Sequence, residues 1–334
     1  METRIQTALA ERFAELAGAR AAQVNACTLL SGGTIQQNWR FDLTLDGGPL
    51  DGPLDAVLRT NSDTVLNESL SRAQEFNLFQ VAFAAGVRVP EPLFFLEDDN
   101  PLGRPLFLMR RVSGNAVGHK LVKCFPNGEP NLCQTLGRQL AAIHTIEPPI
   151  TKLGFLGNVP ENPAIAWVQR LRSDLDKLGT SRPALELGLH WLEHNAPSEQ
   201  NITLCHNDYR TGNYMVDNGQ LTGVLDWEFA GWGCPMQDVG WFTAPCWRFG
   251  ANERVGGGIG TLEDFVTGYE AESPKILPLD QLGYWQCLAT VRWAVIALAQ
   301  GERHQSGEQP SLELALTHHV VPELEYDVLE LIDG

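Results

Sequence analysis

The sequence predicts an α+β protein of two lobes, a small lobe built on an antiparallel sheet and a larger helical lobe. Between about residues 22 and 112, hydrophobic residues alternate in short runs that Gly, Pro and Asp interrupt, which is typical of strands. Beyond residue 113 they recur at helical spacing over longer segments. A chain of 334 residues is long enough for two such units. We expect the lobes to span 1–112 and 113–334.

The small lobe is predicted to hold an N-terminal surface helix, five strands and one further helix. That further helix runs from about 66 to 85 and ends at Gly86. A turn-rich stretch at 45–55 is expected to be a surface loop between strands. The result is a small antiparallel sheet with a helix on one face. The residues that give the first segment its helical spacing are Ile5, Leu9, Phe13 and Leu16. The strands are expected at about 23–33, 38–48, 54–60, 91–99 and 104–114.

The larger lobe is predicted to follow a short connection near 110–116 and to be helical apart from one insert. The insert, residues 205–231, has a strand–loop–strand pattern and carries an unusual number of polar groups. The helices are expected at about 130–146, 163–178, 182–196, 235–248, 261–272, 279–302 and 311–332.

Composition excludes several classes of protein. The chain has 24 Lys and Arg against 41 Asp and Glu, a net charge of −17, which disfavours nucleic acid and anionic membranes as partners. The start lacks the pattern of a secretory signal, and no run of 18 uncharged apolar residues predicts a membrane span. The seven cysteines show no CxxC spacing, so a zinc site or a disulfide framework is not expected. A cytoplasmic protein fits these observations, and its oligomeric state is left open.

The insert CHNDYRTGNYMVDNGQLTGVLDWEFAG predicts a metal site beside a proton acceptor. Asn218-Gly219 is a strong hairpin signal, and a hairpin there returns Asp226 to the side where Asp208 and Asn213 emerge. A carboxylate and an amide oxygen suit Mg²⁺, so Asn213 and Asp226 are the expected ligands. The carboxylate of Asp208 can then accept the proton of an attacking hydroxyl group.

These motifs resemble those of the aminoglycoside phosphotransferase family. "HNDYRTGN" fits His-x-Asp-x-x-x-x-Asn, "LDWE" supplies the later Asp, and the wording is similar to the branch related to the kinase-like domain of acyl-CoA dehydrogenase 10 and 11 proteins. The resemblance covers about residues 25–305 and implies a protein-kinase-like fold and phosphoryl transfer from ATP with Mg²⁺. It also implies supporting roles for His206 and Asp238. Family members often read Gly-Asp-Pro where this chain has Cys234, which questions one supporting hydrogen bond.

Two further residues of the insert have alternative interpretations. Arg210 stands where protein kinases place a Lys near the transferring phosphoryl group, so it either offsets developing charge or forms a salt bridge. Glu228 either orients a neighbour or forms a local ion pair, with the ion pair favoured.

The resemblance places the nucleotide in the small lobe. Gly32 and Gly33 lie in the first strand–turn–strand, where backbone N–H groups of a turn can cover phosphates, although the loop lacks the kinase G-x-G-x-x-G pattern. Arg59 occupies the position of the phosphate-binding Lys, and Glu75 is the expected ion-pair partner of Arg59. The segment "PLFLMRRVSG" resembles the connection between lobes, with backbone groups available to adenine. The three residues of that segment are Met109, Arg110 and Arg111.

The predicted function is transfer of the γ-phosphoryl group of ATP to a hydroxyl group of a small molecule. The acceptor pocket is expected in 241–254 and 279–304, whose acidic residues are few: Glu253, Asp280 and Glu302, against Arg248, Arg254, Arg292 and Arg303. This balance disfavours aminoglycosides and favours a neutral or anionic hydroxylated metabolite. The aromatic residues of these segments, Trp241, Trp247, Tyr284, Trp285 and Trp293, are expected in the core more than in the pocket. A choline- or sugar-type kinase, and a pseudokinase that binds nucleotide without turnover, are the alternatives.

Overall fold

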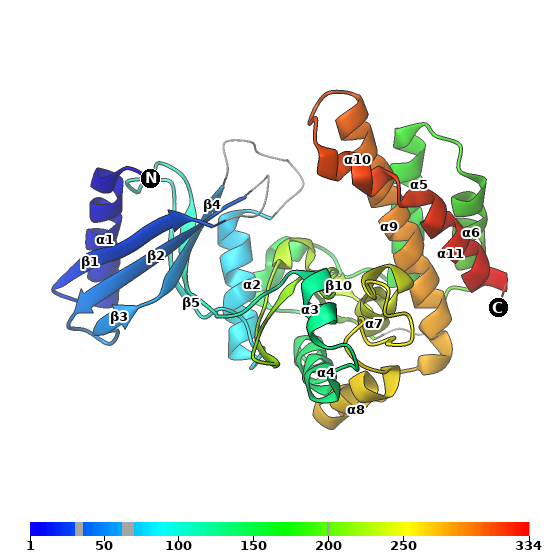
Figure 1. Ribbon diagram of the computed structural model, residues 1–334, viewed down its shortest axis with the longest axis horizontal. Helices are drawn as coiled ribbons and strands as arrows, with labels where there is room; N and C mark the ends of the chain where they lie inside the picture. The colour runs from blue at the N-terminus through cyan, green and yellow to red at the C-terminus, as the bar shows by residue number, and fades with distance from the viewer. Residues whose placement is uncertain (31–35, 62–69, 199–200, 334) are drawn as a thin grey trace.

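A sheet lobe and a helical lobe make up the protein (Figure 1), whose computed structural model describes residues 1–30, 36–61, 70–198 and 201–333. The predicted α+β class is confirmed. The sheet lobe contains β1 (Ala21–Leu29), β2 (Gln36–Asp46), β3 (Gly52–Leu54), β4 (Ala56–Asn61), β5 (Pro92–Leu96) and β6 (Leu106–Arg110). All pairs are antiparallel and the strand order is β1-β2-β4-β6-β5, with β3 paired to β2 alone.

Strand β3 is a difference from the sequence prediction, which expected only a loop at 45–55. Gly47 and Gly48 have φ values of 81° and 78°, so the chain reverses tightly after β2. The reversal lets Leu54 pair with Leu43 and bury its side chain, which is 2% exposed. A short strand therefore forms inside the predicted loop because one leucine can reach the core.

Two helices cover the two faces of the sheet, where the sequence predicted a helix on one face. α1 (Thr3–Ala17) packs Leu9 and Phe13 against the face that includes Leu58, while Leu16 of the predicted stripe is 43% exposed. α2 (Arg72–Ala84) packs on the opposite face, which includes Val57. Because side chains alternate along a strand, Arg59 shares the face of Val57 and points to α2. The described part of α2 begins at the Ser71 capping box, and 66–69 of the predicted helix lie outside the described residues.

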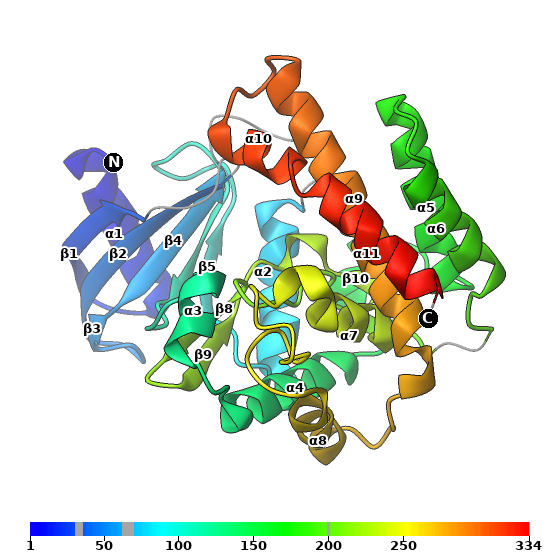
Figure 2. The same cartoon turned by 45° about the vertical axis from the view of Figure 1, so that its right-hand side comes forward.

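The helical lobe is arranged around one long helix, α9, which lies among α5, α6, α7, α10 and α11 (Figures 1 and 2). Its helices are α3 (Gly118–Cys124), α4 (Pro130–His144), α5 (Pro163–Leu178), α6 (Pro183–His194), α7 (Pro235–Thr243), α8 (Leu262–Glu272), α9 (Leu282–Gln305), α10 (Leu312–His318) and α11 (Val321–Asp333). Short 3-10 turns are η1 (Thr151–Leu156), η2 (Trp227–Phe229), η3 (Pro245–Trp247) and η4 (Leu279–Gln281). Helices α4 to α7 each begin with a proline, which suits the first helical position because its missing N–H has no partner there.

Prolines also explain where the helix predictions were too long. The expected helix at 235–248 ends at Thr243 because Pro245 holds Ala244 in an extended conformation with ψ 145°. The expected helix at 311–332 is broken into α10 and α11, and Pro322 stands at the start of α11. α3 is an unpredicted helix of 7 residues in the stretch after the connection between lobes.

One helical segment, Leu279–Gln305, is long and apolar enough to pass a test for membrane spans, and 72% of its most apolar window is buried inside the structure. A helix that is hydrophobic on all sides is also typical of the centre of a large core. Its many neighbours in the helical lobe explain the composition of α9.

The polar insert forms two small antiparallel ladders beside the sheet lobe. β7 (Thr203–Cys205) pairs with β10 (Gly231–Gly233), and β8 (Tyr214–Asp217) pairs with β9 (Gln220–Val224). The predicted hairpin at Asn218-Gly219 is confirmed, with φ values of 49° and 77° at the two turn residues. The N–H of Val224 donates to the carbonyl oxygen of Arg88 at 2.7 Å, which ties the hairpin to the segment between α2 and β5.

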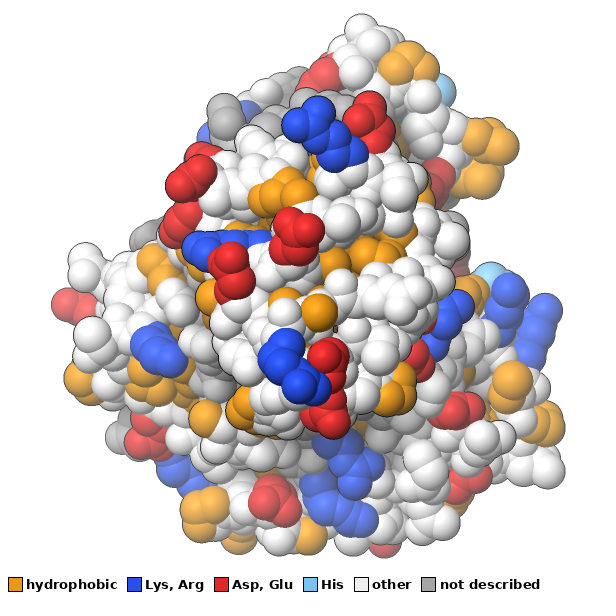
Figure 3. All heavy atoms as spheres, turned by 90° about the vertical axis from the view of Figure 1, so that its left-hand side faces the viewer, with side chains coloured by type: hydrophobic (Ala, Val, Ile, Leu, Met, Phe, Trp, Pro, Cys, Tyr) orange, Lys and Arg blue, Asp and Glu red, His pale blue; other side chains and the backbone are white. Residues whose placement is uncertain are grey.

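The face of the sheet lobe that points away from α9 carries basic and acidic side chains interspersed, with no large area of one charge (Figure 3). Exposed pairs on this lobe include Arg12 with Glu15 at 2.7 Å and Arg20 with Asp46 at 2.6 Å. Such pairs contribute little to stability, since water screens them. On this face the excess negative charge is not gathered into one patch.

Candidate active site

The carboxylate of Asp208 lies at the centre of the loop between β7 and β8. Its Oδ1 atom accepts hydrogen bonds from Nε of Arg210 at 3.0 Å and from Nε1 of Trp241 at 2.9 Å. Its Oδ2 atom accepts a hydrogen bond from Nδ2 of Asn213 at 2.5 Å. Asp208 is only 9% exposed, so these donors replace much of the water that a free carboxylate binds. Together they fix the direction of the carboxylate, as a general base requires.

Asp238 of α7 stabilises the backbone of this loop by accepting hydrogen bonds from it. Its Oδ2 and Oδ1 atoms accept hydrogen bonds from the N–H groups of His206 and Asn207, both at 2.7 Å, and Nε2 of His144 lies 3.2 Å from Oδ2. Asn207 has a φ of 62°, a left-handed value that costs free energy in a residue other than glycine. The supporting position predicted for Asp238 is confirmed, and Cys234 does not prevent it.

His206 connects the loop to the segment that follows the hairpin. Its Nδ1 atom accepts a hydrogen bond from the N–H of Asp208 at 3.2 Å, so Nε2 carries the proton and donates to the carbonyl oxygen of Leu225 at 2.8 Å. Burial lowers the pKa of His206, while Asp238 and Asp208 oppose that shift. The neutral ring is therefore a structural brace, as predicted.

Asp226 is held next to Asn213 by the backbone. The N–H of Leu225 donates to the carbonyl oxygen of Asn213 at 2.8 Å, and Asp226 itself has a left-handed φ of 58°. Its side chain is 45% exposed and its Oδ1 atom lies 3.8 Å from Nη2 of Arg59 on the sheet lobe. The hairpin thus brings Asp208, Asn213 and Asp226 into one site, as the sequence predicted.

Arg59 is anchored by the predicted pair with Glu75 and by a second arginine that sequence reasoning missed. Nη2 of Arg59 lies 2.7 Å from Oε1 of Glu75, and Nε donates to Oε2 at 3.1 Å. Arg72, one helical turn before Glu75, donates to the same Oε2 atom. The three residues are at most 5% exposed. The sequence signal that could have predicted this contact is the i, i+3 spacing of Arg72 and Glu75.

Acidic groups crowd the space between Arg59 and the hairpin. Partial burial raises the pKa of Asp226, Asp208 and Glu75 add to the rise, and Arg59 opposes it. Burial and the adjacent Asp226 raise the pKa of Glu228 to about 7. A bound cation relieves such repulsion between like charges.

The donor set of this crowded site fits Mg²⁺. Because Nδ2 of Asn213 donates to Asp208, the Oδ1 atom of Asn213 is the one left to bind a cation. A carboxylate and an amide oxygen are hard ligands of the kind that Mg²⁺ prefers.

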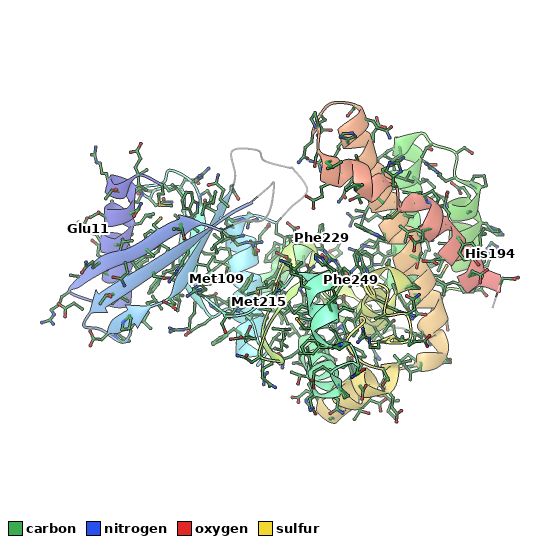
Figure 4. The ribbon with its side chains drawn as sticks, in the orientation of Figure 1. Glu11, Met109, His194, Met215, Phe229 and Phe249 are labelled. Carbon is green, nitrogen blue, oxygen red and sulfur yellow. The ribbon has the colours of Figure 1, made fainter. Side chains whose placement is uncertain are left out.

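The other residues that the sequence predicted to contact the nucleotide are Gly32, Gly33 and the segment from Met109 to Arg111. Gly32 and Gly33 lie outside the described residues. Met109 is buried near the end of β6, and Met215 of β8, which is half-buried, also lies where the lobes meet (Figure 4). The N–H groups of Arg110 and Arg111 already donate to the carbonyl oxygens of Glu91 and Asp55, at 2.9 and 3.0 Å. These two N–H groups are therefore not available to a nucleotide.

Trp241 shows why aromatic spacing alone was a weak guide. The residue is 2% exposed, as expected of a core side chain, yet it donates a hydrogen bond to Asp208. The acidic residues of the two candidate pocket segments, Glu253, Asp280 and Glu302, are all exposed. They do not form a buried acidic pocket.

Comparisons with known proteins agree with this geometry. Residues 26–274 match the model of a family described as the phosphotransferase enzyme family. Acyl-CoA dehydrogenase family member 10 of Mus musculus is 27% identical over 271 residues, which are 76% of this chain and 25% of that protein. This chain therefore spans about a quarter of the length of that relative.

Two solved structures have the same fold. A Ralstonia eutropha protein assigned as an aminoglycoside phosphotransferase has a TM-score of 0.77 and 20% identity, over 98% of this chain and 97% of that chain. A thermostable mutant of aminoglycoside phosphotransferase APH(4)-Ia, in a ternary complex with AMP-PNP and hygromycin B, has a TM-score of 0.59 and 17% identity, over 97% of each chain. The predicted protein-kinase-like fold and family resemblance are confirmed.

Proposed function

The chain belongs to the phosphotransferase enzyme family, and we propose that it transfers the γ-phosphoryl group of ATP, with Mg²⁺, to a hydroxyl group of a small molecule. The observation that carries the proposal is the joining of Asp208 and Asn213 by one hydrogen bond, with Asp226 beside them and facing Arg59. In this proposal residues 1–112 hold the nucleotide, and residues 113–334 supply the reacting groups and the acceptor site.

Asp208 is the proposed general base. The acceptor hydroxyl oxygen forms a bond to the γ-phosphorus, and the bond from that phosphorus to the β,γ-bridging oxygen breaks, so ADP leaves with the electron pair. The hydroxyl proton passes to Asp208. Hydrogen bonds from Arg210 and Trp241 to Oδ1 hold the carboxylate in position before the reaction. Little free energy is therefore needed to orient the base when the proton is transferred.

Asn213 and Asp226 are the proposed ligands of Mg²⁺, which when bound neutralises charge on the phosphate oxygens. Arg59 would contact the phosphates while Glu75 and Arg72 hold its position. Arg210 pairs with Asp208, so the salt-bridge interpretation is observed, and the stabilisation of developing charge is an additional proposed role. The backbone of the segment from Met109 to Arg111 would face adenine, and Gly32 and Gly33 would cover the phosphates.

Two substitutions test the assignment. Asp208→Asn and Asp226→Ala should each abolish Mg²⁺-dependent ADP release in a screen of hydroxylated metabolites, because the first removes the base and the second a metal ligand. Asp99→Asn, at an exposed aspartate in the turn between β5 and β6, is the control and should retain wild-type turnover. Circular dichroism should show an intact fold in all three. Turnover by Asp226→Ala would refute the metal assignment.

A nucleotide-binding protein without turnover is the second candidate, because Arg59 stands where kinases have Lys. The planar guanidinium is committed to two oxygens of Glu75, which a compact ammonium would not match. Thermal shift with ATP, with and without Mg²⁺, separates the two candidates. Stabilisation that needs Mg²⁺ supports the kinase, whereas equal stabilisation without Mg²⁺ supports the binding protein.

The cytoplasm is the proposed compartment for this reaction. All seven cysteines are free thiols, which is typical of a reducing environment.

A further inference from the structure

A buried arginine beside the proposed base forms no direct ion pair among the described residues. Arg292 of α9 is 9% exposed, and its guanidinium carbon lies 4.3 Å from the ring centre of Trp241 and 4.5 Å from that of Trp167. The two indoles, from α7 and α5, hold the cation between them. Within the described ranges, no carboxylate lies within 4.0 Å of its guanidinium nitrogens, and none of its N–H groups donates a hydrogen bond. Burial lowers the pKa of Arg292 to about 10, while the more distant carboxylates of Asp208 and Asp238 oppose that shift.

The buried guanidinium of Arg292 requires an anion that accepts its hydrogen bonds. Contact with aromatic rings contributes attraction but satisfies none of the five N–H donors of a guanidinium. Buried charges in proteins are normally paired and hydrogen-bonded, since removal from water is costly. The neighbouring Arg170 cannot neutralise this charge, because it is also positive. Its guanidinium carbon lies 5.3 Å from the centre of the same Trp167 ring. Asp208 and Asp238 attract the cation without contacting it, so its N–H donors are left for an anion from outside the chain.

The position of Arg292 relates that anion to the reaction. The ring of Trp241 contacts Arg292 through its face and donates its Nε1 hydrogen to Asp208 at 2.9 Å. One indole therefore separates the unpaired cation from the proposed base. Nε1 of Trp247, whose ring centre is 5.2 Å from that of Trp241, is a second buried donor without a hydrogen-bond partner among the described residues.

A groove with room for a small molecule begins at Trp293, one residue along α9 from Arg292, although Arg292 does not line it. Trp293, the next residue along α9, packs against Trp247 with ring centres 4.8 Å apart and borders an open groove of about 900 Å³. Phe249, labelled in Figure 4, and Leu316 of α10 line the same groove. Pockets that bind small molecules have volumes of roughly 300–1,000 Å³.

We propose that Arg292 binds an oxyanion of the acceptor, a carboxylate or a phosphate, so that the substrate of this kinase is a hydroxylated acid. The inference rests on the proposed function and adds the chemical class of the acceptor to it. A guanidinium matches either oxyanion with two parallel hydrogen bonds. Held there, the acid places its hydroxyl group on the Asp208 side of Trp241. A cationic acceptor such as an amino sugar or choline would be repelled.

The test compares acceptors that differ only in charge. Hydroxycarboxylates of two to eight carbons are assayed beside their primary amides, the corresponding amino alcohols and the hydroxyalkyl phosphates. Wild-type protein should prefer one of the two acid classes over the amide by roughly 10- to 100-fold in kcat/KM, the range for a hydrogen bond to a charged group. The two acid arms distinguish carboxylate from phosphate. Equal use of acid and amide, or preference for the amino alcohol, overturns the proposal.

Variants separate binding from a merely structural role. Arg292→Gln should remove the preference for the acid over the amide, mainly through KM, and Arg292→Lys should restore part of it. The ratio is measured within one preparation, so partial unfolding cancels. Arg170→Gln, at the exposed arginine over the same indole, is the matched control and should keep the wild-type ratio. A ratio that is unchanged in Arg292→Gln overturns the proposal.

A binding measurement keeps this inference separate from the proposed function. Calorimetry with the same hydroxycarboxylates and hydroxyalkyl phosphates needs no turnover. Binding of an acid but not its amide supports the oxyanion site even if ATP is never consumed, in which case only the kinase assignment fails. ATP consumption together with equal binding of acid and amide defeats the oxyanion site alone.

Discussion

Asp238 is predicted to be the residue on which the shape of the catalytic loop depends most. Asp238→Ala leaves the N–H groups of His206 and Asn207 buried without their acceptor, and each such group costs about 1–3 kcal/mol. We therefore expect a loss of roughly 2–6 kcal/mol in the free energy of unfolding, and about half of that for Asp238→Asn, which keeps one acceptor oxygen. His144 loses its partner as well.

The assay combines stability with two functional readouts. Urea unfolding followed by tryptophan fluorescence gives the free energy, while ADP release and thermal shift with ATP give turnover and nucleotide binding. We expect kcat to fall with nucleotide binding retained, because Arg59 and Glu75 lie on the sheet lobe. Asp264→Ala is the control, since Asp264 also accepts a backbone N–H but at an accessible helix start, where the cost is about 1 kcal/mol. If Asp238→Ala lies within about 1 kcal/mol of wild type and keeps its kcat, the reasoning is wrong.

Two further predictions concern pH and packing. Glu228 has a pKa raised from 4.5 to about 7, so its contribution to stability is complete below 4.5 and is lost as pH rises through 7. In Mg²⁺-free urea unfolding, Glu228→Gln should gain stability relative to wild type between pH 5 and 8, and parallel profiles would contradict this. Gly268→Ala should cost about 1–3 kcal/mol, because its Cβ would lie 1.9 Å from the carbonyl oxygen of Gln134. Gly283→Ala, with open space around it, should be neutral or stabilising, and equal costs at both glycines would exclude the packing explanation.

Local chemistry was enough to predict most elements and the core of the site. Alternation of Phe41, Leu43 and Leu45 marked β2, because a strand buries every second side chain. The Asn218-Gly219 turn required a hairpin, and that hairpin returned Asp226 to Asp208 without knowledge of any distant contact. Signals of this kind lie within a few residues of each other, so the sequence contains them directly.

Contacts between distant segments were decided by the tertiary structure alone. Arg292 is the single charged residue between Asp280 and Glu302, yet only the packing of α5 and α7 against α9 places it between two indoles. Strand β3 formed because Leu54 found a buried position against β2. A sequence determines which residues prefer burial, strand or turn, whereas the partner that each one meets depends on how the whole chain fills its core.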